Sequence, residues 1–326
     1  MSVYTLVTGA VVLACGLCCG LSPALAQDYP SRQPIRLVVP FAPGGFTDVV
    51  ARILSNRLGV ALKQSVVVEN RPGAGSTIGT EFAARSSPDG YTLVMVSTTH
   101  AVNPAVYRRL NYDPLGAFSP VAKLVDAAYV LVVHPSIPVA TLSEFIDYVK
   151  SRPGVLHYAS SGNGSSQHLM AALLASMTGM QMRHVPYRGS AGATQDLLAG
   201  IVESSVAGVP NAISHLATGR LRALGVTTAY RIAQLPAVPT FSEAGVSGYD
   251  ASVWLAILAV AGTPKSIVDL LSEEIRKVLM QADVQAALFD AGVQPSYADP
   301  LQTRDLIEGE IAKWGRVIRA IDMKLD

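Results

Sequence analysis

Cysteine is absent from this 326-residue chain after residue 19. All three cysteines (Cys15, Cys18 and Cys19) lie in an apolar N-terminal stretch. The rest of the chain therefore needs no disulfide in an oxidising compartment. The same absence excludes a thiol nucleophile, an iron–sulfur cluster and a cysteine zinc site from that part of the chain.

Charge and paired histidines are also scarce. Charged residues make up 15% of the chain and the net charge is +1, which excludes a nucleic-acid binder that would need a basic face. The six histidines are scattered, and none forms a His-x-His or His-x-x-x-His pair. We therefore expect no metal and no cofactor. No Gly-x-Ser-x-Gly elbow supports an α/β-hydrolase.

The N-terminus has the pattern of an export signal. Residues 1–27 carry no charged side chain, and Ala24-Leu25-Ala26 forms a small-x-small site before Gln27. This predicts a cleavable signal peptide over residues 1–26 and a periplasmic protein. The absence of Lys and Arg before the apolar run is atypical. Two alternatives stay open: an uncleaved membrane anchor, because the run is nearly long enough to span a membrane, and a lipoprotein, because the run contains Cys15, Cys18 and Cys19.

Three glycine-containing junctions between a strand and a helix carry most of the functional signal. We call them the first corner (residues 40–48), the second corner (residues 72–80) and the third corner (residues 160–168). The first N–H groups of a helix lack intrahelical partners and face a positive dipole end, so each corner can hold a carboxylate. Each such hydrogen bond contributes about 1.5–3 kcal/mol. The alternative is three ordinary tight turns with self-capping helices.

Strand-like and helix-like stretches alternate along the chain, which favours an α/β fold. Helices are expected from residue 76 or 77 to 85, from residue 166 onward, and from about residue 301 to 321. The apolar runs 129–133 and 254–260 are expected to cross between two lobes. We assign residues 27–128 plus 250–326 to one lobe and residues 129–249 to the other.

Three side chains near strand-to-helix junctions (Phe46, His168 and Arg188) have both a functional and a structural interpretation, and two others have only a structural one. The ring of Phe46 can pack on the apolar body of a ligand or cover the local core. Thr47 and Asp48 suit a helix N-cap and first turn, where the carboxylate orders its own loop. His168 can face a cleft or solvent, and Arg188 can meet a carboxylate or form an exposed ion pair.

Eight motifs together resemble the periplasmic receptors of tripartite tricarboxylate transporters, the Bug-type solute-binding proteins. The first four are PFAPGGFTD (40–48), VVVENRPGAGSTIG (66–79), PDGYTL (88–93) and NPAVY (103–107). The others are HVPYRG (184–189), LRALGVTT (221–228), LPAVPTFSEAGVSGY (235–249) and AGTPKSIV (261–268). In order, they cover nearly all of the chain after the leader.

The resemblance implies a two-lobed type II periplasmic binding fold (a Venus flytrap) with mixed sheets and no catalysis. It implies that backbone amides of the first two corners hold a carboxylate and that the second lobe adds further contacts. The site residues expected on this basis are Phe41, Gly44, Gly45, Phe46, Thr47, Asp48, Ala74, Gly75, Ser76, Thr98, Ser160, Asn163, Ser165, His168 and Val209.

The resemblance also implies a monomer that serves one large and one small integral membrane subunit. One residue and one short segment depart from the family pattern: Phe46 stands where a small residue is usual, and residues 205–208 lack the acidic residue of some members. We therefore expect a di-, tri- or aromatic carboxylic acid rather than an amino acid. The alternatives are an exported sensor or binding subunit not coupled to transport, and an exported enzyme on the same fold.

Overall fold

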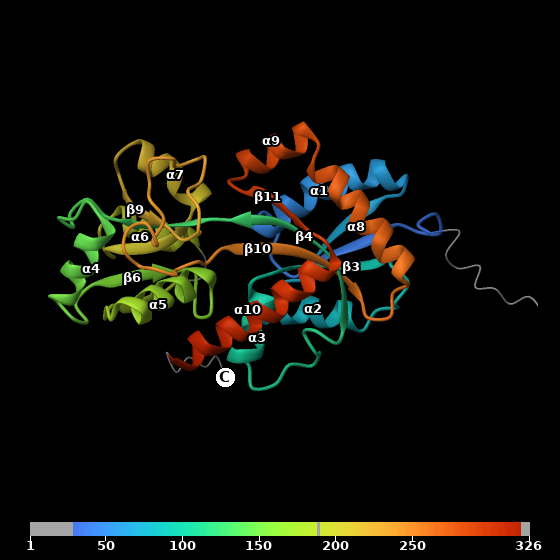
Figure 1. The fold of residues 1–326 in the computed structure, drawn as a ribbon, viewed down its shortest axis with the longest axis horizontal. Coiled ribbons are helices and arrows are strands. Elements are labelled where there is room, and N and C mark those ends of the chain that lie inside the picture. Colours follow the sequence, from blue (N-terminus) through green and yellow to red (C-terminus); the bar gives the residue numbers. More distant parts are fainter. Residues whose placement is uncertain (1–28, 188–189, 321–326) are drawn as a thin grey trace, which may run out of the picture.

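Two mixed β-sheets flanked by helices form the molecule (Figure 1). The computed structural model describes residues 29–187 and 190–320, so the predicted signal peptide lies outside the described residues. The predicted α/β class with mixed sheets is confirmed. None of the helices in residues 29–187 and 190–320 combines the length and the hydropathy that a membrane span requires.

The first sheet has six strands in the order β11-β4-β10-β3-β1-β2. Strand β1 pairs in parallel with β2 and β3, whereas β10 runs antiparallel to β3 and β4. β10 is buried along its whole length, as expected for an apolar strand covered on both faces. The strands are β1 (Ile35–Val39), β2 (Val66–Asn70), β3 (Thr92–Ser97), β4 (Phe118–Ala127), β10 (Val253–Val260) and β11 (Gln294–Ala298).

The first sheet and the helices that pack around it are called the first lobe. Helix α10 lies against α3 and β4, and α1 lies against β2, α8 and α9. The helical segments are α1 (Phe46–Leu62), the 3₁₀ turn η1 (Ala74–Ser76), α2 (Thr77–Ala84), α3 (Thr99–Val106), α8 (Lys265–Leu279), α9 (Ala282–Asp290) and α10 (Pro300–Ala320).

The second sheet, with its helices, is called the second lobe and has the strand order β7-β6-β8-β5-β9. Its strands are β5 (Tyr129–Val133), β6 (His157–Ser160), β7 (Arg183–Pro186), β8 (Ser204–Gly208) and β9 (Arg222–Val226). Its helices are α4 (Leu142–Lys150), α5 (Ser166–Thr178), α6 (Ser190–Leu198) and α7 (Val209–Ala217). In β5, Leu131 and Val133 join one apolar cluster while Val130 and Val132 join another, because successive strand side chains point to opposite faces.

The chain crosses between the lobes at two adjacent places. One crossing is Ala128, between β4 and β5, and the other is the segment 227–252, between β9 and β10. Thr227 N donates to Tyr129 O at 2.9 Å, and Ala251 N donates to Thr227 O at 2.8 Å, so the two crossings are held together. The expectation that the runs 129–133 and 254–260 themselves cross was wrong. Each pairs along its length within a single sheet.

Candidate functional site

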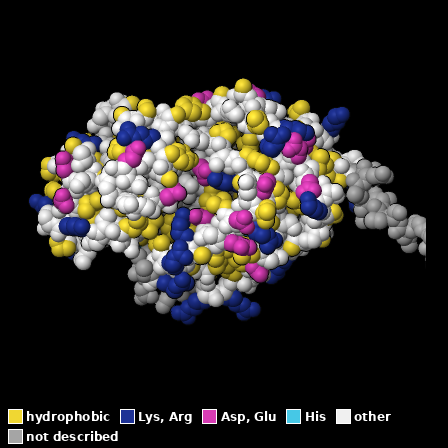
Figure 2. Space-filling view, viewed as in Figure 1, with side chains coloured by type: hydrophobic (Ala, Val, Ile, Leu, Met, Phe, Trp, Pro, Cys, Tyr) yellow, Lys and Arg dark blue, Asp and Glu magenta, His cyan; other side chains and the backbone are white. Residues whose placement is uncertain are grey.

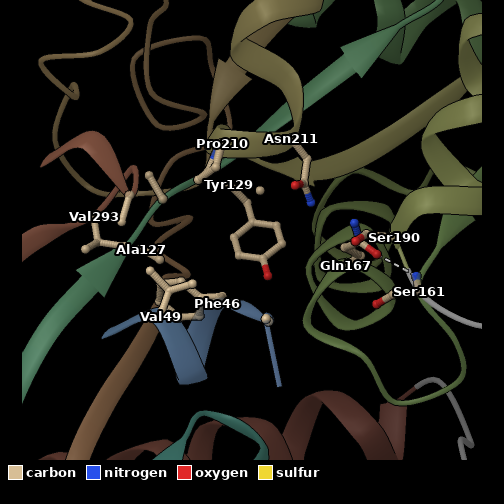
Figure 3. Close-up of a pocket in the computed structure, with 15 residues that line it drawn as sticks. Phe46, Val49, Ala127, Tyr129, Ser161, Gln167, Ser190, Pro210, Asn211 and Val293 are labelled. Atoms are coloured by element: carbon tan, nitrogen blue, oxygen red, sulfur yellow. Dashed lines mark hydrogen bonds between the residues drawn. The ribbon is translucent and has the colours of Figure 1, made fainter. Parts of the chain in front are cut away.

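A cavity of about 410 Å³ lies between the lobes, and several helices begin at its wall. The starts of α1, α6 and α7 border it, together with the first turn of α5 and the crossing between β4 and β5 (Figure 3). The lining residues are Gly44, Gly45, Phe46, Val49, Ala127, Ala128, Tyr129, Ser161, Gln167, Ser190, Gly208, Pro210, Asn211, Ala291 and Val293. The cavity is therefore built by segments that are far apart in the sequence.

The first corner presents the start of α1 to this cavity. Gly45 is the N-cap residue in an extended conformation, so the expectation that Thr47 caps the helix was wrong. Thr47 lies inside the first turn, and Asp48 reaches back to accept from Gly44 N at 2.9 Å. Within the described chain, the N–H groups of Phe46 and Thr47 donate no hydrogen bond. The corner therefore leaves donors free beside the cavity.

Asp48 holds the shape of this corner. Its buried carboxylate accepts from Arg52 Nε at 2.9 Å and from Asn70 Nδ2 at 2.9 Å, in addition to Gly44 N. The hydrogen bond from Arg52, helped by those from Gly44 and Asn70, lowers the pKa of Asp48 to about 2. The carboxylate is ionised at neutral pH and already surrounded by donors, which fits an ordering role.

The second corner is an unusual stretch of backbone. Gly73, Ala74, Gly75 and Ser76 all have positive φ, a conformation that is costly for alanine and serine. Asn103 Nδ2 supports it by donating to Gly75 O at 3.0 Å. Ala74, Gly75 and Ser76 do not line the cavity. Positive φ at non-glycine residues often accompanies functional loops, so the strain itself motivates a functional role.

The third corner satisfies most of its own backbone donors. Ser161 N donates to Gln167 Oε1, and Gly164 N donates to His168 Nδ1 at 3.2 Å. Ser165 caps α5 by accepting from His168 N at 3.3 Å. Ser160 Oγ, which lies 2.6 Å from His184 Nε2, accepts from Gly162 N at 3.1 Å. The self-capping interpretation therefore describes this corner.

His168 lies inside the third corner. Its ring stacks on that of His184 with centroids 3.8 Å apart. Burial, together with the nearby His184, lowers the pKa of His168 to about 4, so the ring is neutral at pH 7. His168 does not line the cavity.

The polar side chains of the cavity come mainly from the second lobe and from the crossing. Figure 3 shows the Tyr129 hydroxyl pointing into the space between Phe46 and Gln167. Gln167 uses its oxygen for Ser161 N, and its Nε2 donates to no other described residue. Asn211 is exposed in the first turn of α7. Burial raises the pKa of Tyr129 to about 12, so it stays a neutral hydrogen-bonding group.

Among the described residues that line the cavity, none has a charged side chain. An anion there would be held by backbone N–H groups, helix dipoles and neutral side chains. A ligand ammonium would have no carboxylate partner in the lining. On the outer surface, by contrast, basic and acidic side chains lie beside one another over the face shown in Figure 2.

The structure brings only part of the predicted set to the cavity. Gly44, Gly45 and Phe46 line it. Two of the others have clear structural surroundings: Thr98 Oγ1 accepts from Trp254 N at 3.2 Å, and Val209 packs in an apolar core. Arg188 lies outside the described residues. The predicted residues that do not line the cavity are Phe41, Thr47, Asp48, Ala74, Gly75, Ser76, Thr98, Ser160, Asn163, Ser165, His168 and Val209.

Sequence reasoning did not single out several residues that line the cavity. Tyr129 was assigned only to a crossing strand, and Gln167 and Asn211 were passed over. Both lie in the first turn of a helix, next to a glycine-containing junction, and that position was an available signal. Pro210 and Val293 carry no local signal, because only the fold brings them together.

Comparisons with known proteins agree on one family. The family model described as "Tripartite tricarboxylate transporter family receptor" matches residues 50–323. Protein BugT of Bordetella pertussis is 39% identical over 306 residues, which cover 93% of this chain and 94% of BugT.

Solved structures of similar proteins have the same fold. Rpa4515 from R. palustris, solved with adipate, has a TM-score of 0.81 and 37% identity, covering 91% of this chain and all of that one. MatC from Rhodopseudomonas palustris, solved with bound malate, has a TM-score of 0.75 and 32% identity, covering 88% of this chain and 99% of that one. The periplasmic binding protein BugD has a TM-score of 0.77 and 31% identity, covering 90% of this chain and 99% of that one. The predicted two-lobed periplasmic binding fold is confirmed.

Proposed function

The chain belongs to the tripartite tricarboxylate transporter receptor family, and on that premise we propose that it captures a small carboxylate between its lobes and delivers it to a membrane transporter. The supporting observation is the cavity at the start of α1, where Phe46 lines the wall, the N–H groups of Phe46 and Thr47 are unpaired, and no described lining residue is charged. Two or three such donors, at about 1.5–3 kcal/mol each, offset much of the cost of desolvating one carboxylate. A micromolar ligand needs about −8 kcal/mol in total.

The lining also supports a ligand with an apolar body. Phe46, Val49, Ala127 and Val293 form one side in Figure 3, and Gln167 with Asn211 lies on the other. A carboxylate at the α1 start would place its carbon chain or ring against the apolar side and any distal oxygen near the amides. Because no acidic residue occurs among the described lining residues, we propose a di-, tri- or aromatic carboxylic acid without an amino group.

Binding is proposed to work as a two-state clamp. The described chain crosses between the lobes at Ala128 and within the segment 227–252, both outside the strands of the two sheets, so the lobes can bend about these crossings while each sheet stays intact. A ligand that touches both lobes favours the arrangement in which they approach, and the transporter would recognise that arrangement. The clamp binds and releases its ligand unchanged, so we expect no turnover.

A thermal-shift screen tests the ligand class. The panel contains adipate, malate, citrate and benzoate, and glucose is the neutral control. Glutarate and glutamate are added as a matched pair, because they differ by one ammonium group. A ligand at about a hundred times its Kd adds about 2.7 kcal/mol of stability. We expect at least one acid of the panel to raise Tm, and we expect glutarate to raise Tm more than glutamate does. A shift by glucose alone would contradict the proposal.

Two further measurements separate the alternatives. Uptake of the labelled acid by cells with and without the receptor gene tests coupling to transport, and uptake that is independent of the receptor would favour a sensor or binding subunit. Incubation of the protein with the acid, followed by proton NMR, tests for an enzyme. We expect the spectrum of the acid to remain unchanged.

A further inference from the structure

The two lobes touch at a glycine and a proline at the edge of the cavity. Gly292 lies in the turn between α9 and β11 of the first lobe, and Pro210 lies in the first turn of α7 in the second lobe. A Cβ atom added to Gly292 would overlap Pro210 Cγ and come within 2.8 Å of its Cδ. The neighbours Ala291 and Val293 line the cavity, whereas Gly292 does not.

Neither partner of this contact can easily move aside. Gly292 N donates to Phe289 O at 2.8 Å and Val293 N donates to Leu288 O at 3.0 Å, which fixes the turn. The side chain of Leu288 is fully buried. On the other side, the proline ring cannot rotate away, because it is closed onto its own backbone. A side chain at 292 is therefore accommodated by moving the lobes apart.

We propose that Gly292 determines how far the lobes close over the ligand. This inference rests on the proposed clamp. The missing side chain lets the turn between α9 and β11 seat against Pro210, which places Val293 over the cavity opposite the second lobe. A methyl group at 292 holds this edge open and weakens ligand binding without touching the ligand.

A simpler role for Gly292 has to be separated from this one. Its φ of +77° follows directly after α9, a position where glycine is preferred for conformational reasons alone. Gly179 provides a matched control, because it follows α5 with φ of +74° and an added Cβ there meets nothing within 4 Å. Gly292→Ala and Gly179→Ala share the backbone cost, and only the first adds a contact between lobes.

The distance between the lobes can be measured without any ligand. Residues 27–326 contain no cysteine, so in a protein expressed from residue 27 two introduced cysteines give the only spin-label sites. Ala286 on α9 and Ser214 on α7 are both exposed and suit Ala286→Cys and Ser214→Cys. Electron–electron double resonance then reports the separation of the lobes in the parent, Gly292→Ala, Pro210→Ala, double-variant and Gly179→Ala proteins.

We expect Gly292→Ala to shift the distance distribution to longer values and Gly179→Ala to leave it unchanged. In the Pro210→Ala background, which removes the ring, Gly292→Ala should have little further effect. Isothermal titration with adipate as the probe should show that Gly292→Ala weakens the affinity by about 5- to 100-fold, the range expected for an inserted methyl group. This loss should appear only when Pro210 is present.

Two results would overturn the inference: an unchanged distance in Gly292→Ala, or a shift of equal size in the Pro210→Ala background. Failure of adipate to bind any variant would count against the proposed ligand class alone, because the distances are measured without ligand. The two proposals can therefore fail separately.

Discussion

The first and third corners have the same pattern of strand, glycine-rich turn and helix, yet they treat their backbone donors differently. In the first corner, Asp48 accepts from Gly44 N and leaves the N–H groups of Phe46 and Thr47 free. In the third corner, the side chains of Gln167 and His168 accept from the turn itself. Among the described residues, both helix starts leave their first two N–H groups unpaired: Phe46 and Thr47 in α1, and Ser166 and Gln167 in α5. The side chain of Ser165 caps the third N–H of α5, whereas α1 has no side-chain cap, so α1 offers more unpaired donors to an anion.

The two corners accordingly play different parts at the cavity. The first corner offers backbone donors together with the apolar ring of Phe46. The second lobe offers neutral side chains, Gln167 and Asn211, on a framework that is already internally bonded. We infer that the first lobe binds the carboxylate and the second lobe recognises the rest of the ligand.

Among the changes that test the difference between the first and third corners, Asp48→Ala is expected to have the largest effect. The change removes a buried carboxylate that accepts three hydrogen bonds, so the free energy of unfolding should fall by about 2–4 kcal/mol. Ser165→Ala, which removes the cap of the third corner, should cost only about 1 kcal/mol. Urea denaturation measures both. Equal costs would show that the corners are held equally firmly.

A second pair of variants separates the amide of Phe46 from its ring. Gly45 is extended and Phe46 is the first helical residue, so Phe46→Pro fits the backbone and removes one N–H donor. Phe46→Ala keeps the donor and removes only the ring. Titration with the acid that the screen identifies should show Phe46→Pro binding roughly 10- to 150-fold more weakly than Phe46→Ala. Equal affinities would mean that this amide does not contact the ligand.

Lowering the pH should reduce the stability contributed by the third corner and should leave the ion pair and hydrogen bonds of the first corner unchanged. The pKa of His168 is about 4 in the folded protein against an ordinary 6.5, so the unfolded state binds more protons between these values and stability falls as pH falls. For this partly exposed ring we expect a loss of about 1–2 kcal/mol between pH 7 and pH 4. Asp48, with a pKa of about 2, stays ionised throughout this window.

The control for the pH effect is His168→Gln, which keeps an acceptor and cannot be protonated. Buried His100, whose pKa burial also lowers to about 4, contributes in the same window and remains in this variant. Urea denaturation at pH 7 and pH 4 should therefore show a smaller acid-induced loss in His168→Gln than in the parent. An identical loss would assign the whole pH dependence to His100 and other groups.

The smallest effect on ligand affinity is expected from a change in the second lobe. Asn211→Ala removes a neutral amide from the cavity wall and should weaken binding by about 2- to 10-fold. Asn163, in the exposed turn of the third corner, does not line the cavity, so Asn163→Ala should leave affinity unchanged. If Asn163→Ala has the larger effect, the turn of the third corner reaches the ligand and the assignment of Asn211 is wrong.

Local patterns predicted much of the fold. The start of α5 at Ser166 and the bounds of α2 and α10 agree with the expected helices to within about one residue, because caps and apolar periodicity are local features. The positions of the crossings were mistaken, because an apolar run of five to eight residues reads the same within a sheet and between lobes.

The cavity was less predictable than the helices. Gly44, Gly45 and Phe46 line the cavity as expected, because they stand at the start of a helix within one motif of the resemblance. Pro210 and Val293 are separated by more than eighty residues and meet only through the strand order of two sheets. The contact between Gly292 and Pro210 likewise depends on how the lobes approach, which no local pattern records.

The most direct test is a crystal structure with the tightest-binding acid of the screen. We expect a ligand carboxylate oxygen within about 3.2 Å of the backbone nitrogen of Phe46 or Thr47, with the ligand body between Phe46 and the amides of Gln167 and Asn211. A carboxylate held instead by a charged side chain, or a ligand outside the cavity between the lobes, would contradict this expectation.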